Sequence, residues 1–370
     1  MSTIESAYKY RIYPNKQQKE IIAKTFGSCR FVYNKYLALR IGKYQKSKES
    51  FSYVQCANDM KKLKSELEWL KEVDSTSLQS SLRDLDMAYQ KFFKEHSGFP
   101  KFKSKKDRYK SYRTSCTNNN ISFCDKHIKL PKLGMIKIRD KQIPQGRILN
   151  ATISQEPNGH YYCSLCCTEI ELPQYQQTNK NVGIDLGIAD FAIFSDGTKI
   201  ENPRFFEKSE DKLAKLQREL SRKTIGGSNW NKARIKVANL QKHISNQRQD
   251  FLHKLTTEIV KSFDTICIED LDVKSMKETD SKTRNKRVGD VSWSEFRKQL
   301  TYKSNWYGKQ LSVVDRYYPS SQICHVCGER DGKKSEDIRK WICPYCHSEL
   351  DRDVNASINI LNEGLKILSI

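Results

Sequence analysis

Residues 181–197, NVGIDLGIADFAIFSDG, decide the fold that we expect for the second half of this 370-residue chain. Apolar residues alternate with small or polar ones from Val182 to Leu186, and a second apolar run ends at a turn formed by Asp196 and Gly197. The pattern predicts two short strands of an α/β sheet. Asp185 lies among apolar neighbours, where an unpaired carboxylate is costly or becomes protonated. On this stretch alone, Asp185 is either a metal ligand or a hydrogen-bonded turn residue.

Two other acidic positions could share a site with Asp185. Glu269 follows a predicted strand over residues 266–268, and Asp353 stands at the start of a predicted C-terminal helix. Two acids on strands and one at a helix start are the arrangement that a two-metal phosphodiesterase needs to hold two Mg²⁺ ions. Asp353 is the better ligand candidate, because Asp351 can serve as the N-cap of the same helix. Spacing alone is weak evidence, since the acids lie far apart in the chain.

Four cysteines predict a structural zinc site. They follow the pattern C-x2-C-x15-C-x2-C and are Cys324, Cys327, Cys343 and Cys346. Two CxxC turns can offer four thiolates to one tetrahedral zinc ion, which leaves no open position for a substrate. The histidines next to these cysteines, His325 and His347, are not expected to be ligands. Three other cysteines lie in a predicted strand and are expected in a core; they are Cys163, Cys166 and Cys167.

The chain carries a strong positive charge. It contains 66 lysines and arginines against 44 aspartates and glutamates, a formal net charge of +22. This excess favours nucleic acid over an anionic membrane surface as the partner. The sequence has no apolar run long enough for a membrane span and no signal-like start, so we expect a cytoplasmic, nucleoid-associated protein without a membrane partner.

Two basic segments are candidates for contact with nucleic acid. Residues 98–113 interleave aromatics with cations, which suits phosphate contact and base stacking, and the candidates there are Lys101, Lys103, Lys105 and Lys106. A basic helical region over residues 205–262, interrupted near 225–228, has cations at three-to-four spacing, among them Arg218 and Arg222. A solvated loop and a solvated helix face are the alternatives.

Periodicity predicts a helical region near the start of the chain. A strand over residues 5–13 precedes a helical bundle over residues 16–97. Gly27 is expected to break the first long helical pattern into two helices. Asp74 or Ser75 is expected to cap the last helix of the bundle.

Further along the chain, β-like runs over residues 119–172 suggest a small barrel. The polar, charged stretch over residues 275–290 is expected to be a loop of the kind that covers a site. A helix is predicted over residues 293–307, followed by a strand.

Ordered sequence blocks resemble the TnpB (OrfB) type of insertion-sequence protein, a relative of the type V CRISPR effectors with a RuvC-like nuclease domain. The eight blocks, which are very unlikely to follow one another in order by chance, read GSCRFVYNKYL, LQSSLRDLDMAYQKFF, GFPKFKSKKD, VGIDLGIADFAIFSDG, ICIEDLDVKSM, SWSEFRKQLTYKSNWYGKQL, VVDRYYPSSQICHVCG and WICPYCHSELDRDVNASINIL. The resemblance implies an α/β fold with added β-barrel and helical parts. Its domains would be a wedge (OB-like) β-barrel over 1–15 and 98–178, a helical recognition domain over 16–97, a RuvC/RNase H-like nuclease domain over 179–323 and 351–370, and a zinc ribbon inserted at 324–350.

The resemblance also assigns roles to residues. Asp185, Glu269 and Asp353 match the three RuvC acids, which hold two catalytic Mg²⁺ ions, and the four cysteines match the zinc-binding insertion. Gln79 lies in the block that resembles the reader of a flanking DNA motif, and Tyr112 follows the Lys-rich loop, so both are hypotheses for DNA contact. A helix-surface or core role is the alternative for each.

The implied activity is cleavage of double-stranded DNA that matches a guide RNA derived from the end of the element. We expect a monomer with one RNA and leave a dimer open, and residues 280–290 would cover or uncover the acids. A guide-RNA-dependent DNA-binding regulator without cleavage is the alternative, and the three intact acids argue against it. A transposase that itself joins DNA strands is a third hypothesis, which the resemblance disfavours.

Overall fold

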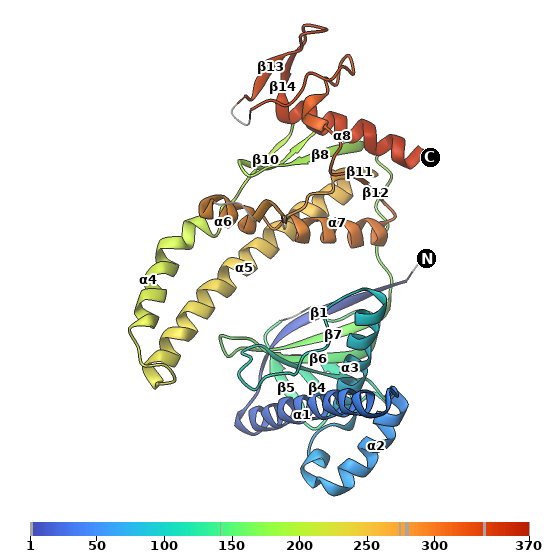
Figure 1. Cartoon of the computed structure of the whole chain (residues 1–370), viewed down its shortest axis with the longest axis vertical. Helices are drawn as coiled ribbons and strands as arrows, with labels where there is room; N and C mark the ends of the chain where they lie inside the picture. Colours follow the sequence, from blue (N-terminus) through green and yellow to red (C-terminus); the bar gives the residue numbers. More distant parts are fainter. Residues whose placement is uncertain (1–2, 141, 274, 278–280, 336–337, 370) are drawn as a thin grey trace. The chain divides into compact units, whose positions relative to one another are not determined.

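A computed structural model of the chain describes residues 3–140, 142–273, 275–277, 281–335 and 338–369. The chain divides into two compact units, residues 1–171 and 172–370, and each has its own sheet (Figure 1). Among the described residues, no helix is both long and apolar enough to cross a membrane.

The described residues of the first unit form three α-helices and one seven-stranded antiparallel sheet. The helices are α1 (Lys16–Ser47), α2 (Tyr53–Glu66) and α3 (Ser75–Lys94), with a 3-10 turn, η1 (Glu68–Lys71), before α3. The strands are β1 (Ile4–Tyr13), β2 (Lys110–Ser115), β3 (Ser122–Cys124), β4 (His127–Leu130), β5 (Gly134–Ile138), β6 (Arg147–Gln155) and β7 (Tyr161–Ile170). They hydrogen-bond in the order β2-β6-β7-β1-β5-β4-β3. Closure of this sheet into a barrel stays a prediction.

Side-chain alternation along the strands explains the core of the first unit. Tyr10 and Ile12 point to the same side of β1, and both are buried. Cys163, which lies opposite Tyr10 on β7, and Cys167 are also buried free thiols, as predicted for core cysteines. Cys166 points to the other side and is partly exposed, as the period of two in a strand requires.

The first helix does not break where we expected. α1 continues through Gly27, although a glycine inside a helix costs about 1 kcal/mol relative to alanine. The neighbouring Phe26 and Cys29 are buried, and this burial outweighs the local cost. The cap of α3 agrees with the prediction, because the Asp74 carboxylate accepts the Ser77 N–H at 3.1 Å.

The described residues of the second unit form a mixed five-stranded sheet, a two-stranded sheet and several helices. The strands are β8 (Asn181–Leu186), β9 (Asp190–Phe194), β10 (Lys199–Glu201), β11 (Thr265–Glu269), β12 (Gln310–Val314), β13 (Lys340–Ile342) and β14 (Glu349–Asp351). The α-helices are α4 (Glu210–Ser221), α5 (Ser228–Ser262), α6 (Lys282–Val291), α7 (Trp293–Tyr307) and α8 (Arg352–Ser369). Short 3-10 turns are η2 (Glu207–Ser209), η3 (Ser275–Lys277) and η4 (Ser320–Gln322). The larger sheet has the order β10-β9-β8-β11-β12.

The central strands of this sheet bring two acids together. β8 is antiparallel to β9 and parallel to β11, with Ile184 opposite Ile268. Asp185 and Glu269 follow these two residues, so both lie at the carboxyl ends of neighbouring parallel strands. Ligand sites of α/β sheets commonly form at this edge.

Helices cover both faces of the five-stranded sheet. Val182 and Ile184 pack into a core with α5, α6 and α7. Cys267 packs on the other face with Ile360 of α8. α4 and α5 lie side by side as a helical hairpin that extends away from the sheet (Figure 1). The predicted interruption of the basic helical region near 225–228 is confirmed.

Helix α8 packs directly against β8 and β11. A Cβ on Gly183 would come within 2.0 Å of the Ser357 carbonyl oxygen, and a Cβ on Gly364 would come within 2.4 Å of the Cys267 Sγ. Only glycine allows the helix to approach the sheet so closely. This packing brings the first turn of α8, which contains Asp353, to the edge of the sheet where the strand-borne acids lie.

The segment over residues 275–290 differs from the expected loop. Residues Ser275–Lys277 form η3 and residues Lys282–Val291 form α6, while the part of the prediction that concerns 278–280 lies outside the described residues. Val288 and Val291 are at most 3% exposed and join the core between the sheet and its helices. Their burial stabilises a helix in a segment whose polar composition suggested a loop.

Candidate active site and metal centre

The three predicted acids line one cavity of about 270 Å³. Asp185 comes from β8, Glu269 from the end of β11 and Asp353 from the first turn of α8. The fold therefore brings together side chains from three distant segments of the chain. Converging carboxylates at a cavity are the donor set that hard divalent cations prefer.

The environment of Asp185 disfavours its charge. Burial, followed by the charges of Glu269 and Asp353, raises the pKa of Asp185 to about 8. Arg352 and the backbone N–H of Leu186 oppose this rise. A divalent cation would reverse the balance, because it favours the ionised form of every carboxylate around it. The residues present therefore fit a Mg²⁺ site.

Glu269 is held in place by a hydroxyl group. Burial raises the pKa of this carboxyl, and a hydrogen bond donated by Ser320 to Glu269 Oε1 counteracts the rise. The sequence interpretation missed Ser320. Its signal was available in the block VVDRYYPSSQICHVCG, where it follows the predicted strand that pairs with β11.

Asp351 caps α8, as predicted. Its Oδ1 accepts the backbone N–H groups of Asp353 and Val354 at 3.0 and 3.1 Å, and its Oδ2 lies 2.8 Å from Lys199 Nζ. Burial alone would raise the pKa of Asp351, but the hydrogen bond from Lys199 and those from the helix N-terminus lower it. Asp351 is thus occupied with structural contacts, which leaves Asp353 to face the cavity.

Arg339 supplies a counter-charge to this cavity. Its Nη1 donates to Asp353 Oδ2 at 2.6 Å, and it comes from the segment just before β13. Asp353 is 15% exposed and Arg339 is 56% exposed, so the pair sits at the cavity mouth. The sequence interpretation missed Arg339 because the pair joins two segments whose proximity depends on the folded insertion.

The four predicted cysteines form a compact cluster. Their sulfur atoms lie within 4.8 Å of one another, the one such group of potential metal ligands among the described residues. The distances from Cys324 to Cys346 and from Cys327 to Cys343 are both 3.7 Å. Hydrogen bonding with Ser348 lowers the pKa of Cys346, whereas burial and the neighbouring cysteines raise the pKa of Cys327, so the four thiols share their protons unequally while no metal is bound. Four clustered thiols fit a closed tetrahedral zinc site.

Two asparagines of α8 anchor the cysteine-rich insertion. Asn355, which is fully buried, accepts the His325 N–H at 2.9 Å and donates to the Ile323 carbonyl at 2.7 Å. Asn359 donates to the carbonyls of Ile323 and Ser320 at 2.7 and 2.8 Å. The first CxxC turn is therefore fixed to the same helix whose first turn contains Asp353.

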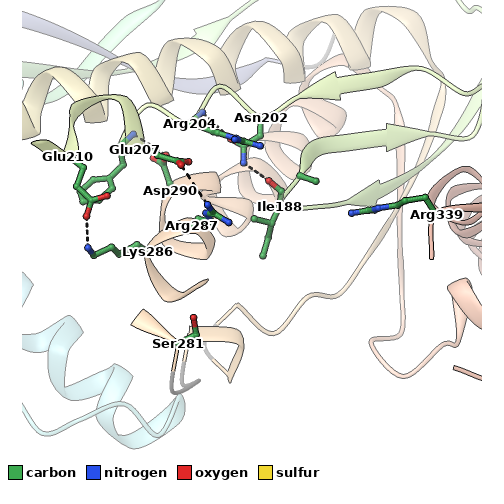
Figure 2. A pocket seen from close by; sticks show the side chains of 12 residues that line it. Ile188, Asn202, Arg204, Glu207, Glu210, Ser281, Lys286, Arg287, Asp290 and Arg339 are labelled. Carbon is green, nitrogen blue, oxygen red and sulfur yellow. Dashed lines mark hydrogen bonds and ion pairs between the residues drawn. The ribbon is translucent and has the colours of Figure 1, made fainter. Parts of the chain in front are cut away.

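A larger hollow of about 500 Å³ adjoins the acid cavity and shares Ile188, Ala189 and Arg339 with it (Figure 2). Charges across this hollow are largely paired. Figure 2 shows Lys286 of α6 directed to Glu210 at the start of α4. It also shows Arg287 directed to Glu207, with 3.6 Å between Arg287 Nη2 and Glu207 Oε1. Asp290 of α6 accepts the Phe206 N–H at 2.9 Å and pairs with Arg248 at 2.6 Å. These contacts tie α6 to the base of the α4–α5 hairpin.

Most residues predicted to contact nucleic acid are exposed. Gln79 lies on the outer face of α3, and Arg218 and Arg222 lie near the end of α4. The predicted lysines lie in the irregular segment before β2 and are Lys101, Lys103, Lys105 and Lys106. Their positions are compatible with binding, and their roles stay predictions.

Tyr112 corrects one of these predictions. It is 7% exposed, and its ring packs edge-on against Phe26 with 5.7 Å between ring centroids. Burial raises its pKa well above the usual range for tyrosine. Tyr112 points inward from β2, so it is a core residue and cannot contact DNA in this conformation.

Three family models match the chain. One described as "Probable transposase" matches residues 164–280, one described as "Cas12f1-like, TNB domain" matches residues 293–360, and one described as "Helix-turn-helix domain" matches residues 1–49. The last description differs from the structure, because the described residues of that region form β1 and a single continuous helix, α1.

Two bacterial proteins are similar along nearly the whole chain. A protein of Streptomyces pristinaespiralis named "Putative RNA-guided DNA endonuclease" is 38% identical, with 99% of this chain and 90% of that protein covered. A protein of Escherichia coli (strain K12) named "Putative RNA-guided DNA endonuclease InsQ" is 34% identical, with 98% and 93% covered.

Two solved structures share the fold. The "Cryo-EM structure of the Cas12f1-sgRNA-target DNA complex" matches with a TM-score of 0.56 at 12% identity and covers 97% of this chain and 99% of that one. The "Structure of the mini-RNA-guided endonuclease CRISPR-Cas_phi3" matches with a TM-score of 0.52 at 10% identity and covers 98% and 92%. At these identities the likeness concerns the fold alone.

Proposed function

The chain belongs to the TnpB (OrfB) type of insertion-sequence proteins, relatives of the type V CRISPR effectors, and from this premise we propose that it is an RNA-guided DNA endonuclease. A guide RNA from the element end selects double-stranded target DNA by base pairing, and the protein cuts it next to a short flanking motif. The observation that carries the proposal is the meeting of Asp185, Glu269 and Asp353 in one cavity.

The proposed chemistry is two-metal phosphodiester hydrolysis. Mg²⁺ ions held by the three acids would supply an activated water and stabilise the leaving oxygen. The chain contributes position: β8 and β11 hold Asp185 and Glu269 side by side, Ser320 orients Glu269, and the α8 N-terminus presents Asp353. Arg339 would balance the charge of Asp353 when no metal ion is bound beside it.

The architecture supports a domain assignment for this chemistry. We assign the RuvC/RNase H-like nuclease domain to residues 179–323 and 351–370, because the mixed sheet presents its acids where β8 and β11 run parallel. We assign residues 324–350 to a zinc ribbon that holds one structural Zn²⁺. In the first unit, residues 1–15 and 98–178 would form the wedge domain and residues 16–97 the recognition domain.

Nucleic-acid contact is assigned to exposed residues of both units. Gln79 would read the flanking duplex motif, and the lysines at 101, 103, 105 and 106 would contact phosphates together with Arg218 and Arg222. The net charge of +22 supports this partner class. The protein would act as a monomer with one guide RNA, in the cytoplasm and close to the nucleoid.

The proposal is tested with RNA that copurifies with the full-length protein. Sequencing this RNA gives the guide, and the complex is then incubated with Mg²⁺ and plasmids that carry the matching target beside a randomised flanking library. We expect linear plasmid enriched in one short flanking motif. Binding of the matched target without any cut product would overturn the nuclease assignment in favour of a guide-dependent regulator. Strand-joined products formed by protein and element ends without RNA would instead favour a transposase.

A further inference from the structure

A second cavity, of about 480 Å³, opens next to the acid cavity. The two cavities share Leu186, Glu269 and Trp293 as lining residues, so they meet at one of the proposed metal ligands. This second cavity continues along α7, and none of its lining residues lines the charge-paired hollow that adjoins Ile188. The proposed chemistry does not use the α7 side.

One wall of this cavity is a row of exposed polar side chains on α7. Ser294, Lys298, Thr301 and Asn305 stand at intervals of four, three and four residues, and all four are exposed cavity-lining residues. These intervals place them on one face of the helix, over a length of about 16 Å. Each side chain can donate a hydrogen bond to a phosphate oxygen. We call these four residues the α7 polar row.

The opposite face of α7 fixes the polar row in place. Gln299 is fully buried and its Nε2 lies 3.2 Å from Gln249 of α5. Lys303 is 5% exposed and donates to Thr256 Oγ1 and Thr257 Oγ1, both at 2.7 Å. α7 therefore cannot rotate without breaking buried hydrogen bonds, and the polar row has a fixed orientation toward the cavity.

The other wall is apolar. Leu271 and Val273, which follow β11, line it together with Leu186. Tyr302 also lines the cavity, but it comes from α7 itself, beside the polar row, and its ring lies 4.6 Å from that of Trp306. Arg297 is a lining residue too, but its guanidinium is already paired with the Asp270 carboxylate. The cavity thus offers hydrogen-bond donors and one aromatic ring on α7, and an apolar surface on the strand side.

We propose that the α7 polar row binds the backbone of an unpaired segment of the DNA strand that is cut, and leads that strand to Glu269. The inference rests on the proposed nuclease function. Phosphates lie along the polar row with Lys298 as the charged contact, and bases lie against Leu271, Val273 and Tyr302. A strand held this way carries a phosphate from the α7 side into the acid cavity.

A single strand fits these walls better than other ligands do. A base-paired duplex hides the faces of its bases, so it cannot use the apolar wall or the Tyr302 ring. Lys298 is 72% exposed and, among the described residues, its one ion pair is the 3.9 Å contact with Glu295, so its charge is available to a phosphate. The volume is in the range of pockets that hold one drug-sized molecule, which suits a nucleotide or two of a single strand.

The test combines charge reversal on the polar row with two separate readouts. In the guide-loaded full-length protein, the triple variant Lys298→Glu, Thr301→Glu and Asn305→Glu should cut matched plasmid about tenfold or more slowly in single turnover, because carboxylates repel the strand. Binding of the matched duplex should change by less than about twofold, since guide pairing governs it. A milder variant, Lys298→Gln, should slow cutting by a smaller factor, and its melting temperature checks that the fold is intact.

Lys366→Glu is the matched control. Lys366 lies near the end of α8, is 72% exposed and, like Lys298, has an acid three residues before it in its own helix. Its reversal should leave the rate of cutting within about twofold of that of the parent protein. Equal cutting by the triple variant and the parent protein would overturn the inference while leaving the nuclease function intact. If the parent protein itself cuts nothing, the proposed function fails instead.

A direct contact can also be mapped without any cutting. Asp185→Asn protein with its guide is mixed with matched DNA that carries 5-iodouracil near the cut position, and is then irradiated. Crosslinks should appear on the peptide that contains Tyr302 and should be reduced by the triple variant. Crosslinks confined to other peptides would place the strand elsewhere and contradict the inference.

Discussion

The second unit contains two groups of potential metal ligands that differ in how they are built. The four thiols come from two turns of one short insertion and lie within 4.8 Å of one another. The three carboxylates come from β8, β11 and α8, and Arg339 stands beside one of them. The thiol group is closed and resembles a structural site, whereas the acid group lines an open cavity.

This difference indicates that the four thiols serve folding and the three carboxylates serve chemistry. The described residues of the insertion form a small core of Trp341, Leu350, Cys324 and Cys343, with Cys346 packed against it, so a bound metal would supply much of its stability. The charged form of Asp185, by contrast, is disfavoured by burial and then by the charges of Glu269 and Asp353, which together raise its pKa to about 8. Loss of a cysteine should therefore destabilise the protein, and loss of the Asp185 carboxyl should stabilise the metal-free protein.

The largest effect is expected from Cys343→Ser. Structural zinc contributes about 10–16 kcal/mol to the folding of small zinc domains, so losing one thiolate should unfold the insertion and release its metal. Metal analysis should find about one zinc per chain in the parent protein and much less in the variant. Cys124→Ser is the control, because Cys124 is an exposed cysteine of the first unit. A parent protein without zinc, or a variant that melts and cuts like the parent, would contradict the structural role.

A smaller effect of opposite sign is expected from Asp185→Asn in protein that keeps its zinc but lacks Mg²⁺. The folded protein holds the Asp185 proton up to about pH 8, whereas the unfolded chain loses it near pH 4. The folded state thus binds more protons between these values, and the stability of the parent protein falls as pH rises through that window. The asparagine of the variant carries no titrating proton, so the variant escapes this loss of stability. Its free energy of unfolding should exceed that of the parent protein by a margin that grows by about 2–3 kcal/mol from pH 6 to pH 8.

Urea unfolding at several pH values measures this trend. Asp196→Asn is the matched control, because Asp196 is an exposed turn residue whose carboxylate accepts the Thr198 N–H at 2.9 Å. The control should show no growing advantage with pH. If Asp185→Asn behaved like the control, burial and the neighbouring acids would not disfavour the charge of Asp185 as the structure indicates.

The smallest of these effects tests the link between the two groups. Asn355→Ala removes the oxygen that accepts the His325 N–H and the amide that donates to the Ile323 carbonyl. Leaving a buried donor without a partner should lower the free energy of unfolding by about 2 kcal/mol. Zinc content should stay at one per chain, while the rate of cutting falls because Asp353 lies two residues away on α8. Unchanged stability and cutting would show that the insertion does not position the acid.

Features that depend on neighbouring residues in the chain could be predicted. The CxxC turns carry their own geometry, and the Asp351 cap follows from its place before an apolar helical pattern. The strands around Asp185 follow from alternation. The roles of the three acids came from the family resemblance, because their spacing alone carries little information.

Features that depend on tertiary contacts could not be predicted. Gly27 has the propensity of a helix breaker, yet burial of its neighbours keeps α1 continuous. The polar stretch that became α6 is helical because Val288 and Val291 reach the core. Tyr112 was misassigned because its place beside a Lys-rich loop outweighed the strand alternation that turns it inward. Arg339 and Ser320 meet the acids only after the insertion and η4 have packed on α8.

We propose that the three carboxylates form the cation-dependent centre that cuts DNA. The most direct measurement is the single-turnover rate at which guide-loaded Asp185→Asn protein cuts matched plasmid in Mg²⁺, at equal guide content and equal target binding. Removing one of three ligands should slow cutting by at least about a hundredfold relative to the parent protein, even though the same substitution stabilises the metal-free fold. A rate within about tenfold of the parent value would contradict the account.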